Sequence, residues 1–152
     1  MCGIPSKCTH GNWILAFSPN YEDEELTDMH ARLIAKKKLA KKQNLKSGKW
    51  LVYVDRSDVD KVWKKIKKAT EEGSLGIEAK VANKIQSDLF GGGKSHVICV
   101  YTHDWTDVKD VMRVREKLKD LGIINKISYK SDEDTIAGKY ARKGDKVSKY
   151  YE

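Results

Sequence analysis

Residues 96–102 have the sequence HVICVYT, a short run of β-branched and apolar side chains. The run is too short for a helix and lies between a glycine-rich loop and polar residues, so it predicts an interior strand of a sheet. Apolar side chains then recur at i, i+3 and i+4 up to Gly122, which is typical of an amphipathic helix. We expect this helix to start at Asp104 or Thr106 and to end at Gly122.

Similar patterns elsewhere predict four more strands and two more helices. The strands are expected at residues 13–17, 49–54, 77–82 and 123–130. One helix should begin near Asn20 and end before Gly48, and another should run to Gly73 from a capping box formed by Ser57 and Asp60. This alternation of strands and helices leaves a parallel and an antiparallel sheet both open.

The chain has 152 residues, the size of one domain, so we expect a single domain over residues 1–152 with a flexible arm at residues 1–10. No run of about 18 apolar residues is present, which favours a cytoplasmic protein without membrane contact. Its three cysteines cannot pair evenly, so a disulfide framework is not expected. Cys2, Cys8 and His10 lack a fourth zinc ligand, and we expect neither a metal nor a cofactor.

Positive charge is concentrated in one part of the chain. Residues 36–68 hold 13 Lys/Arg against 3 Asp, although the whole chain has a net charge of only +8. A concentrated basic segment favours a phosphate-bearing partner such as RNA. The same lysines also suit a solvated helix face, or the C-terminal end of a helix, where cations stabilise the macrodipole.

The candidate phosphate-binding or RNA-binding residues are basic side chains on the predicted helix, strands and tail. They are Lys37, Lys38, Lys41, Lys42, Lys49, Lys80, Lys130, Lys139 and Arg142. Trp105 and Tyr140 are the candidates for stacking on a base, and residues 141–152 form a basic, tyrosine-containing tail.

Two apparent catalytic motifs are incomplete. Cys2 would become an N-terminal nucleophile after removal of Met1, as in glutamine amidotransferases, but that resemblance ends after four residues. The run GGGKS at residues 91–95 lacks the first glycine of a P-loop, where Asp88 stands, and it leads into a strand instead of a helix.

Four strings together resemble the Bles family, named for a basophilic-leukaemia-expressed protein. They are GKWL at 48–51, LGIEAKV at 75–81, HVICVYT at 96–102 and ISYKSD at 127–132, within a family-like core at residues 47–140. The resemblance implies a fold similar to the cap-binding translation initiation factor. That fold is α+β, with a curved, mainly antiparallel sheet of about five or more strands and about three helices packed on one face.

The resemblance also suggests two activities. Some family members are labelled phosphothreonine lyases, which resemble one another in a Lys-x-His pair, a later lysine and phosphate-holding arginines; Lys94, His96, Lys130 and Arg142 are the available residues. Cap binding relies on two tryptophans around a base, and Trp50 and Trp105 are available, although Trp50 opens an apolar strand and is expected in the core.

The function expected from the sequence is binding of RNA or a nucleotide through a basic surface. A lyase that eliminates phosphate from a phosphopeptide and a protein-interaction module are the alternatives. For an anion pocket, we expect Lys80, Lys130 and His103 to cluster more tightly than Lys94 does, because alternation along the strands puts Lys80 and Lys130 on the polar face of the sheet. The oligomeric state and the ligand's identity are open.

Overall fold

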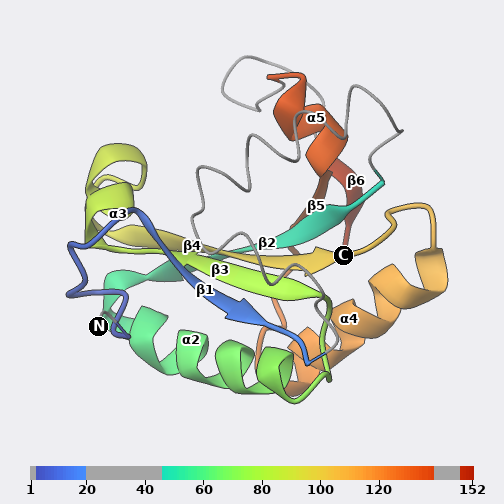
Figure 1. Cartoon of the computed structure of the whole chain (residues 1–152), viewed down its shortest axis with the longest axis horizontal. Coiled ribbons are helices and arrows are strands. Elements are labelled where there is room, and N and C mark those ends of the chain that lie inside the picture. Colours follow the sequence, from blue (N-terminus) through green and yellow to red (C-terminus); the bar gives the residue numbers. More distant parts are fainter. Residues whose placement is uncertain (1–2, 20–45, 139–147) are drawn as a thin grey trace.

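The computed structural model describes residues 3–19, 46–138 and 148–152, and in them the chain forms one antiparallel sheet (Figure 1). The sheet has six strands in the order β1-β3-β4-β2-β5-β6. Their bounds are Trp13–Phe17 for β1, Gly48–Asp55 for β2, Glu78–Ala82 for β3, Ser95–Thr102 for β4, Ser128–Ser131 for β5 and Ser148–Tyr151 for β6. The expected α+β fold with a curved, mainly antiparallel sheet is confirmed.

Strand β4 is an interior strand, as its apolar sequence predicts. It pairs with β2 along its whole length, from Gly48 opposite Thr102 to Asp55 opposite Ser95, and its other edge pairs with β3. Residues 98–102 are buried. With β2 on one edge and β3 on the other, β4 is one of the two middle strands of the sheet.

Two long helices cover one face of the sheet. They are α2 (Arg56–Glu71) and α4 (Val108–Asp120), and both lie below the sheet in Figure 1. Two short helices, α3 (Lys84–Phe90) and α5 (Asp132–Ile136), lie above it in that view. The expected packing of helices on one face is therefore found for the two long ones.

The hydrophobic core lies between the sheet and the long helices. Trp50 of β2 is fully buried, its Nε1 donates to the backbone oxygen of Val111 at 3.0 Å, and its ring meets Tyr129 edge-on at 5.2 Å. Trp63 of α2 is also buried. The expectation that Trp50 belongs to the core is confirmed, because its position on β2 points toward α4.

Both long helices begin at other residues than the sequence predicts. Helix α2 begins at Arg56, and its N-cap residue Asp55 makes no side-chain capping bond, so the predicted capping box is wrong. Helix α4 begins at Val108 with Asp107 as its cap. Asp104 instead accepts from the backbone nitrogen of Thr106 at 2.9 Å, a local turn that competes with helix formation.

Three further differences concern short elements. Helix α3 was not predicted, although Asn83 caps it by accepting from the backbone nitrogen of Gln86 at 3.0 Å. Strand β5 begins at Ser128, five residues later than expected. Part of the predicted tail forms β6, which pairs with β5 and places Tyr150 against Tyr129.

The start of the chain contacts α2 and the residues before α3. Ser6 donates to Asp60 through its backbone nitrogen at 2.9 Å and through Oγ at 2.5 Å, and Cys8 is buried. Cys8 is disulfide-bonded, contrary to the expectation from the cysteine count, whereas Cys99 is free. The flexibility of the 1–10 arm stays a prediction.

Within residues 3–19, 46–138 and 148–152, every helix is too short or too polar to cross a lipid bilayer.

Candidate functional site on the sheet

One face of the sheet points away from α2 and α4, and it carries charged and aromatic side chains. Strand alternation and register assign to it Lys80 of β3, Tyr101 of β4, Lys49 and Tyr53 of β2, and Lys130 of β5. We call it the distal face. As alternation predicts, Lys80 and Lys130 lie on the same face.

Two lysines on the distal face lie beside the ring of Tyr101, and a third stands next to one of them. Lys49 stands directly opposite Tyr101 on one side and opposite Lys130 on the other. The ammonium nitrogens of Lys49 and Lys80 lie 5.7 Å and 5.9 Å from the centre of the Tyr101 ring. Lys80 also lies over the ring of Trp13 at 4.0 Å. Three different strands thus bring cations to one place.

Lys49 has a second partner on this face. Its Nζ donates at 2.7 Å to Oδ1 of Asp132 and at 2.7 Å to Oγ1 of Thr135, while the other carboxylate oxygen accepts from Ser47 at 2.6 Å. Both charged side chains are buried. Lys49, predicted as a phosphate-binding residue, is therefore held by α5, and a direct role with phosphate stays a prediction.

The surroundings of Lys130 disfavour its charged form. Burial lowers its pKa below the ordinary lysine value, and the neighbouring charge of Lys49 lowers it further. Asp134 and Asp132 act in the opposite direction without reversing the shift. An anion placed beside Lys130 would favour its charged form, since an opposite charge offsets both burial and the like charge.

The distal face also contains a buried thiol. Burial raises the pKa of Cys99, and the nearby Lys80 and Lys49 only partly oppose that rise. Cys99 is therefore a neutral thiol and is poorly suited to act as a nucleophile.

The structure separates the residues of the lyase hypothesis. His96 is buried and alternates with Tyr101, so it lies on the face opposite to Lys130. One ring nitrogen, Nδ1, is 2.6 Å from the backbone oxygen of Ala82, and Nε2 accepts from Arg56 at 3.0 Å. Lys94 is exposed in the loop before β4, and Arg142 lies outside the described residues. His96 and Lys130, on opposite faces of the sheet, therefore do not converge on one phosphate.

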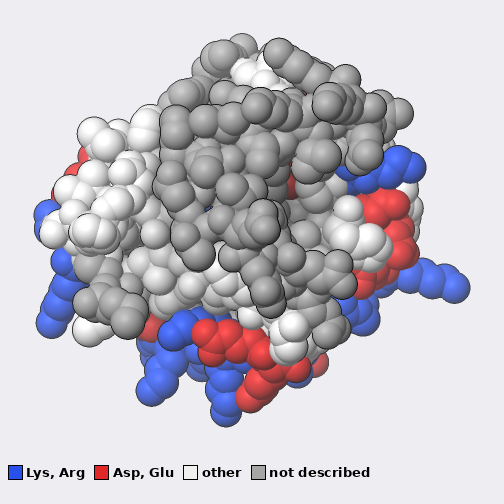
Figure 2. All heavy atoms as spheres, in the orientation of Figure 1, with Lys and Arg blue, Asp and Glu red and all other residues white. Residues whose placement is uncertain are grey.

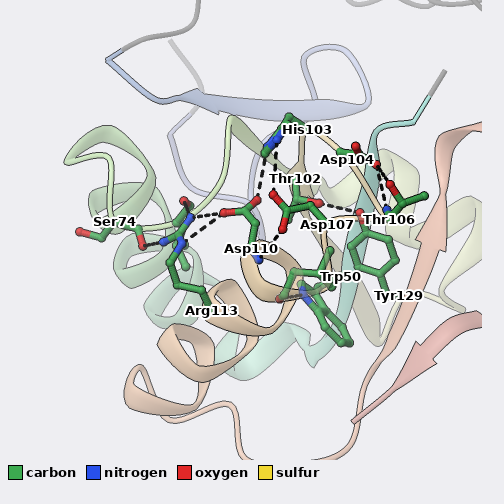
Figure 3. A network of polar contacts seen from close by, with 12 residues as sticks. Trp50, Ser74, Thr102, His103, Asp104, Thr106, Asp107, Asp110, Arg113 and Tyr129 are labelled. Atoms are coloured by element: carbon green, nitrogen blue, oxygen red, sulfur yellow. Dashed lines mark hydrogen bonds and ion pairs between the residues drawn. The ribbon is translucent and has the colours of Figure 1, made fainter. Parts of the chain in front are cut away.

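His103 does not join the lysines, contrary to our expectation. Figure 3 shows it beside the first turn of α4, where its Nε2 lies 3.9 Å from Asp107 and its Nδ1 lies 3.4 Å from Asp110. Asp110 also pairs with Arg113 at 2.9 Å, and Arg113 donates to the backbone oxygen of Leu75 at 3.0 Å. This network ties α4 to the segment after α2.

Trp105 is half-buried beside β6. Its backbone nitrogen donates to Lys46 at 2.7 Å, its backbone oxygen accepts from Tyr150 at 2.7 Å, and Lys149 lies over its ring at 4.6 Å. A stacking role for Trp105 stays a prediction. The other predicted residues, Lys37, Lys38, Lys41, Lys42, Lys139 and Tyr140, lie outside the described residues.

Sequence reasoning missed two exposed aromatic residues. Tyr53 of β2 is 68% exposed and Phe90 at the end of α3 is 66% exposed. The signal for Tyr53 was its spacing of two residues from Leu51 and four from Lys49, which puts the three side chains on one face of the strand. Phe90 could not be placed because α3 was not predicted.

The fold is that of cap-binding translation factors. Schistosome eIF4E in complex with m7GpppA and 4E-BP matches 70% of this chain at 15% identity and a TM-score of 0.54, and its complex with m7GpppG and 4E-BP matches 70% at 16% and 0.52. The structure of C. elegans eIF4E-3 with the 4E-binding protein Mextli and a cap analog is a further match, at 25% identity over 62% of this chain and 55% of that chain, with a TM-score of 0.47. The chain spans 59% of each schistosome protein's length.

Residues 23–136 match the family of the basophilic leukemia-expressed protein Bles03. Because the match covers most of the chain, the chain belongs to that family. The resemblance inferred from the four sequence strings is therefore confirmed.

Proposed function

We propose that the chain binds a phosphate-bearing ligand, a nucleotide or single-stranded RNA, on the distal face of its sheet. The observation that carries the proposal is the placement of three lysines on one face of the sheet: Lys49 and Lys80 lie 5.7 Å and 5.9 Å from the ring centre of Tyr101, and Lys130 stands opposite Lys49 on the next strand. Cations supply the phosphate pairing that nucleotides use, and the half-buried Lys80 is the most accessible of the three, whereas the ring of Tyr101 is 4% exposed and packs within the cluster.

The fold relatives support this class of ligand. The schistosome proteins of similar fold are in complex with m7GpppA and m7GpppG, both of which are nucleotides with a phosphate bridge. The shared fold makes a nucleotide the first ligand class to test here, and the choice of base has to come from this chain's own residues.

The lysines have different parts in the proposed site. Lys80 is half-buried and lies over Trp13, so it is the first candidate for contact with a phosphate oxygen. Lys130 has a lowered pKa. A phosphate beside it would raise that pKa, so that Lys130 would take up a proton when the ligand binds. Affinity should therefore fall as the pH rises through the range in which free Lys130 loses its proton.

Two substitutions test the site. We expect Lys80→Met and Lys130→Met each to weaken binding of a fluorescein-labelled single-stranded oligouridylate by about 10-fold to 150-fold, because a hydrogen bond to a charged group is worth about 1.5–3 kcal/mol. Lys61→Met is the matched control, since Lys61 is exposed on α2, away from the distal face. Figure 2 shows lysine and arginine side chains, in blue, on the lower side of the molecule, where α2 lies. Fluorescence anisotropy at fixed salt gives the affinities, with GTP as a competitor.

An unchanged affinity in both distal-face variants would contradict the proposal, provided that their circular dichroism matches the parent protein. Equal losses in Lys61→Met and Lys80→Met would also contradict it, since they would indicate general attraction by net charge.

We also propose that the lysines of the basic segment add to the electrostatic attraction of RNA. Replacing Lys37, Lys38, Lys41 and Lys42 together by Gln should reduce the slope of log affinity against log salt, by about 0.7 for each lysine that neutralises a phosphate of single-stranded RNA. A salt titration of the quadruple variant measures this, and an unchanged slope removes these four lysines from the RNA contact.

A further inference from the structure

Two large aromatic side chains are exposed at the same end of the sheet. Tyr53 lies on the distal face of β2, and Phe90 ends the helix α3 that follows β3. Their exposed fractions, 68% and 66%, are high for rings of this size. They come from segments far apart in the sequence, so their proximity is a product of the fold.

Tyr53 and Phe90 line one shallow hollow, whose volume is about 60 Å³. Val97 and Ala82 are apolar members of the lining, while Gln86 and Ser95 add polar groups. The hollow thus has aromatic walls, an apolar part and hydrogen-bonding groups. The hollow is much smaller than a ligand pocket of about 300–1,000 Å³, so a flat heterocycle would rest one face on the exposed aromatic rings and reach the polar groups with one edge.

Gln86 has a fixed orientation in this lining. Its carboxamide oxygen accepts from Nδ2 of Asn12 at 2.8 Å, and its backbone nitrogen donates to Asn83. The carboxamide nitrogen is therefore the group that is left to meet an acceptor on a ligand. Acceptors of this kind occur on the edges of every nucleobase.

The hollow lies on the same face as the lysines. Tyr53 follows Lys49 by four residues along β2, a separation of about 13 Å at the usual rise per residue of a strand. A short single-stranded segment can span that distance with a phosphate at the lysines and a base at the hollow. Lys94, which is exposed and directly precedes the lining residue Ser95, adds a cation at the rim.

We infer that the hollow between Tyr53 and Phe90 is a nucleobase-binding subsite for single-stranded RNA. The inference rests on the proposed function, since the lysines would hold the phosphates of the same strand. Aromatic walls favour a base over an apolar peptide side chain, because stacking uses the π-face that every base has. Recognition should therefore tolerate different bases.

A fluorescent base tests the subsite directly. The probe is an oligouridylate that carries one 2-aminopurine, whose fluorescence falls when it stacks on an aromatic ring. We expect Tyr53→Ala to remove this fall and to weaken binding by about 5-fold to 100-fold, the usual range for one stacked base. Tyr53→Phe keeps the ring and should behave like the parent protein.

Tyr151→Ala is the matched control, because Tyr151 is also an exposed tyrosine, at 60%, but lies on the strand β6 at the sheet's edge. Loss of quenching in Tyr53→Ala with retention in Tyr151→Ala supports the subsite. Full quenching and affinity in Tyr53→Ala overturn it, and would leave the exposed aromatic pair as a contact for another class of molecule.

An abasic ribose-phosphate oligomer separates this inference from the proposed function. If it binds as tightly as the oligouridylate, the lysine site stands and the base subsite fails. If neither oligomer binds, the proposed function itself fails. Weaker binding of the abasic oligomer, with no further loss in Tyr53→Ala, supports both.

Discussion

The sharpest test of the fold's energetics concerns Arg115, which is 1% exposed in the middle of α4. Its guanidinium donates three hydrogen bonds to backbone oxygens: Nε to Glu152 at 3.0 Å, Nη1 to Ile123 at 2.8 Å and Nη2 to Asn125 at 2.8 Å. Burial lowers the pKa of the Arg115 guanidinium below the ordinary arginine value. The group nevertheless remains charged, because arginine keeps its proton in proteins. One side chain therefore joins α4, the loop before β5 and the end of β6.

Arg115→Met removes all three donors and leaves three carbonyl oxygens with fewer partners. A net hydrogen bond to a charged group is worth about 1.5–3 kcal/mol, and methionine regains part of the loss by burying its own apolar surface. Since the three bonds share one group and are not additive, we expect a loss of about 3–5 kcal/mol in the free energy of unfolding. Arg115→Lys keeps the charge but not the planar fork, and should lose about 2 kcal/mol.

Urea denaturation followed by tryptophan fluorescence measures both losses at constant pH. The matched control is Lys109→Met, because Lys109 is an exposed cation on the same helix. A surface substitution of this kind usually changes the free energy of unfolding by about 0.5 kcal/mol or less, so this control should stay close to the parent protein. A loss below about 1 kcal/mol for Arg115→Met would refute the assignment of the three-carbonyl contact as a main support of the fold.

Three further predictions concern the sheet. Lys49→Met and Asp132→Asn should each cost about 3 kcal/mol in urea denaturation because a buried charge loses its partner, and the double variant should cost less than the sum; simple additivity would contradict this. Gly76→Ala should destabilise the fold strongly, since its Cβ would fall on the backbone oxygen of Tyr101, and a melting temperature within about 2 °C of the parent would argue against that contact. Because burial raises the pKa of Cys99, its thiolate should be scarce at pH 8, so that mass spectrometry finds slow alkylation at Cys99 in native protein and fast alkylation in urea.

The interior strand and the buried tryptophan were predictable because their signals are local. A β-branched run bounded by loop residues is enough to indicate β4, and Trp50 opens a similar run in β2. Alternation alone also places Lys80 and Lys130 on one face. Short elements gave weaker signals: α3 has seven residues and β6 has four, too few to establish a period.

The candidate site was less predictable because its contacts join distant segments. The ion pair of Lys49 with Asp132 depends on the pairing of β2 with β5, which no sequence pattern specifies. His96 could have faced either side, and only the register with β2 places it opposite to Lys130. The exposure of Tyr53 likewise depends on which strands and helices come to lie beside it.

The strand order has a consequence for how the molecule folds. Strand β1 pairs with β3, and β2 pairs with β4 and β5, so most neighbouring strands are separated by long stretches of chain. Closing such loops costs entropy before the pairing stabilises the chain, and folds dominated by non-local strand pairs take milliseconds to seconds to form. We therefore expect slow folding. Each edge of β4 stays unpaired until its own partner, β2 on one side and β3 on the other, has joined it.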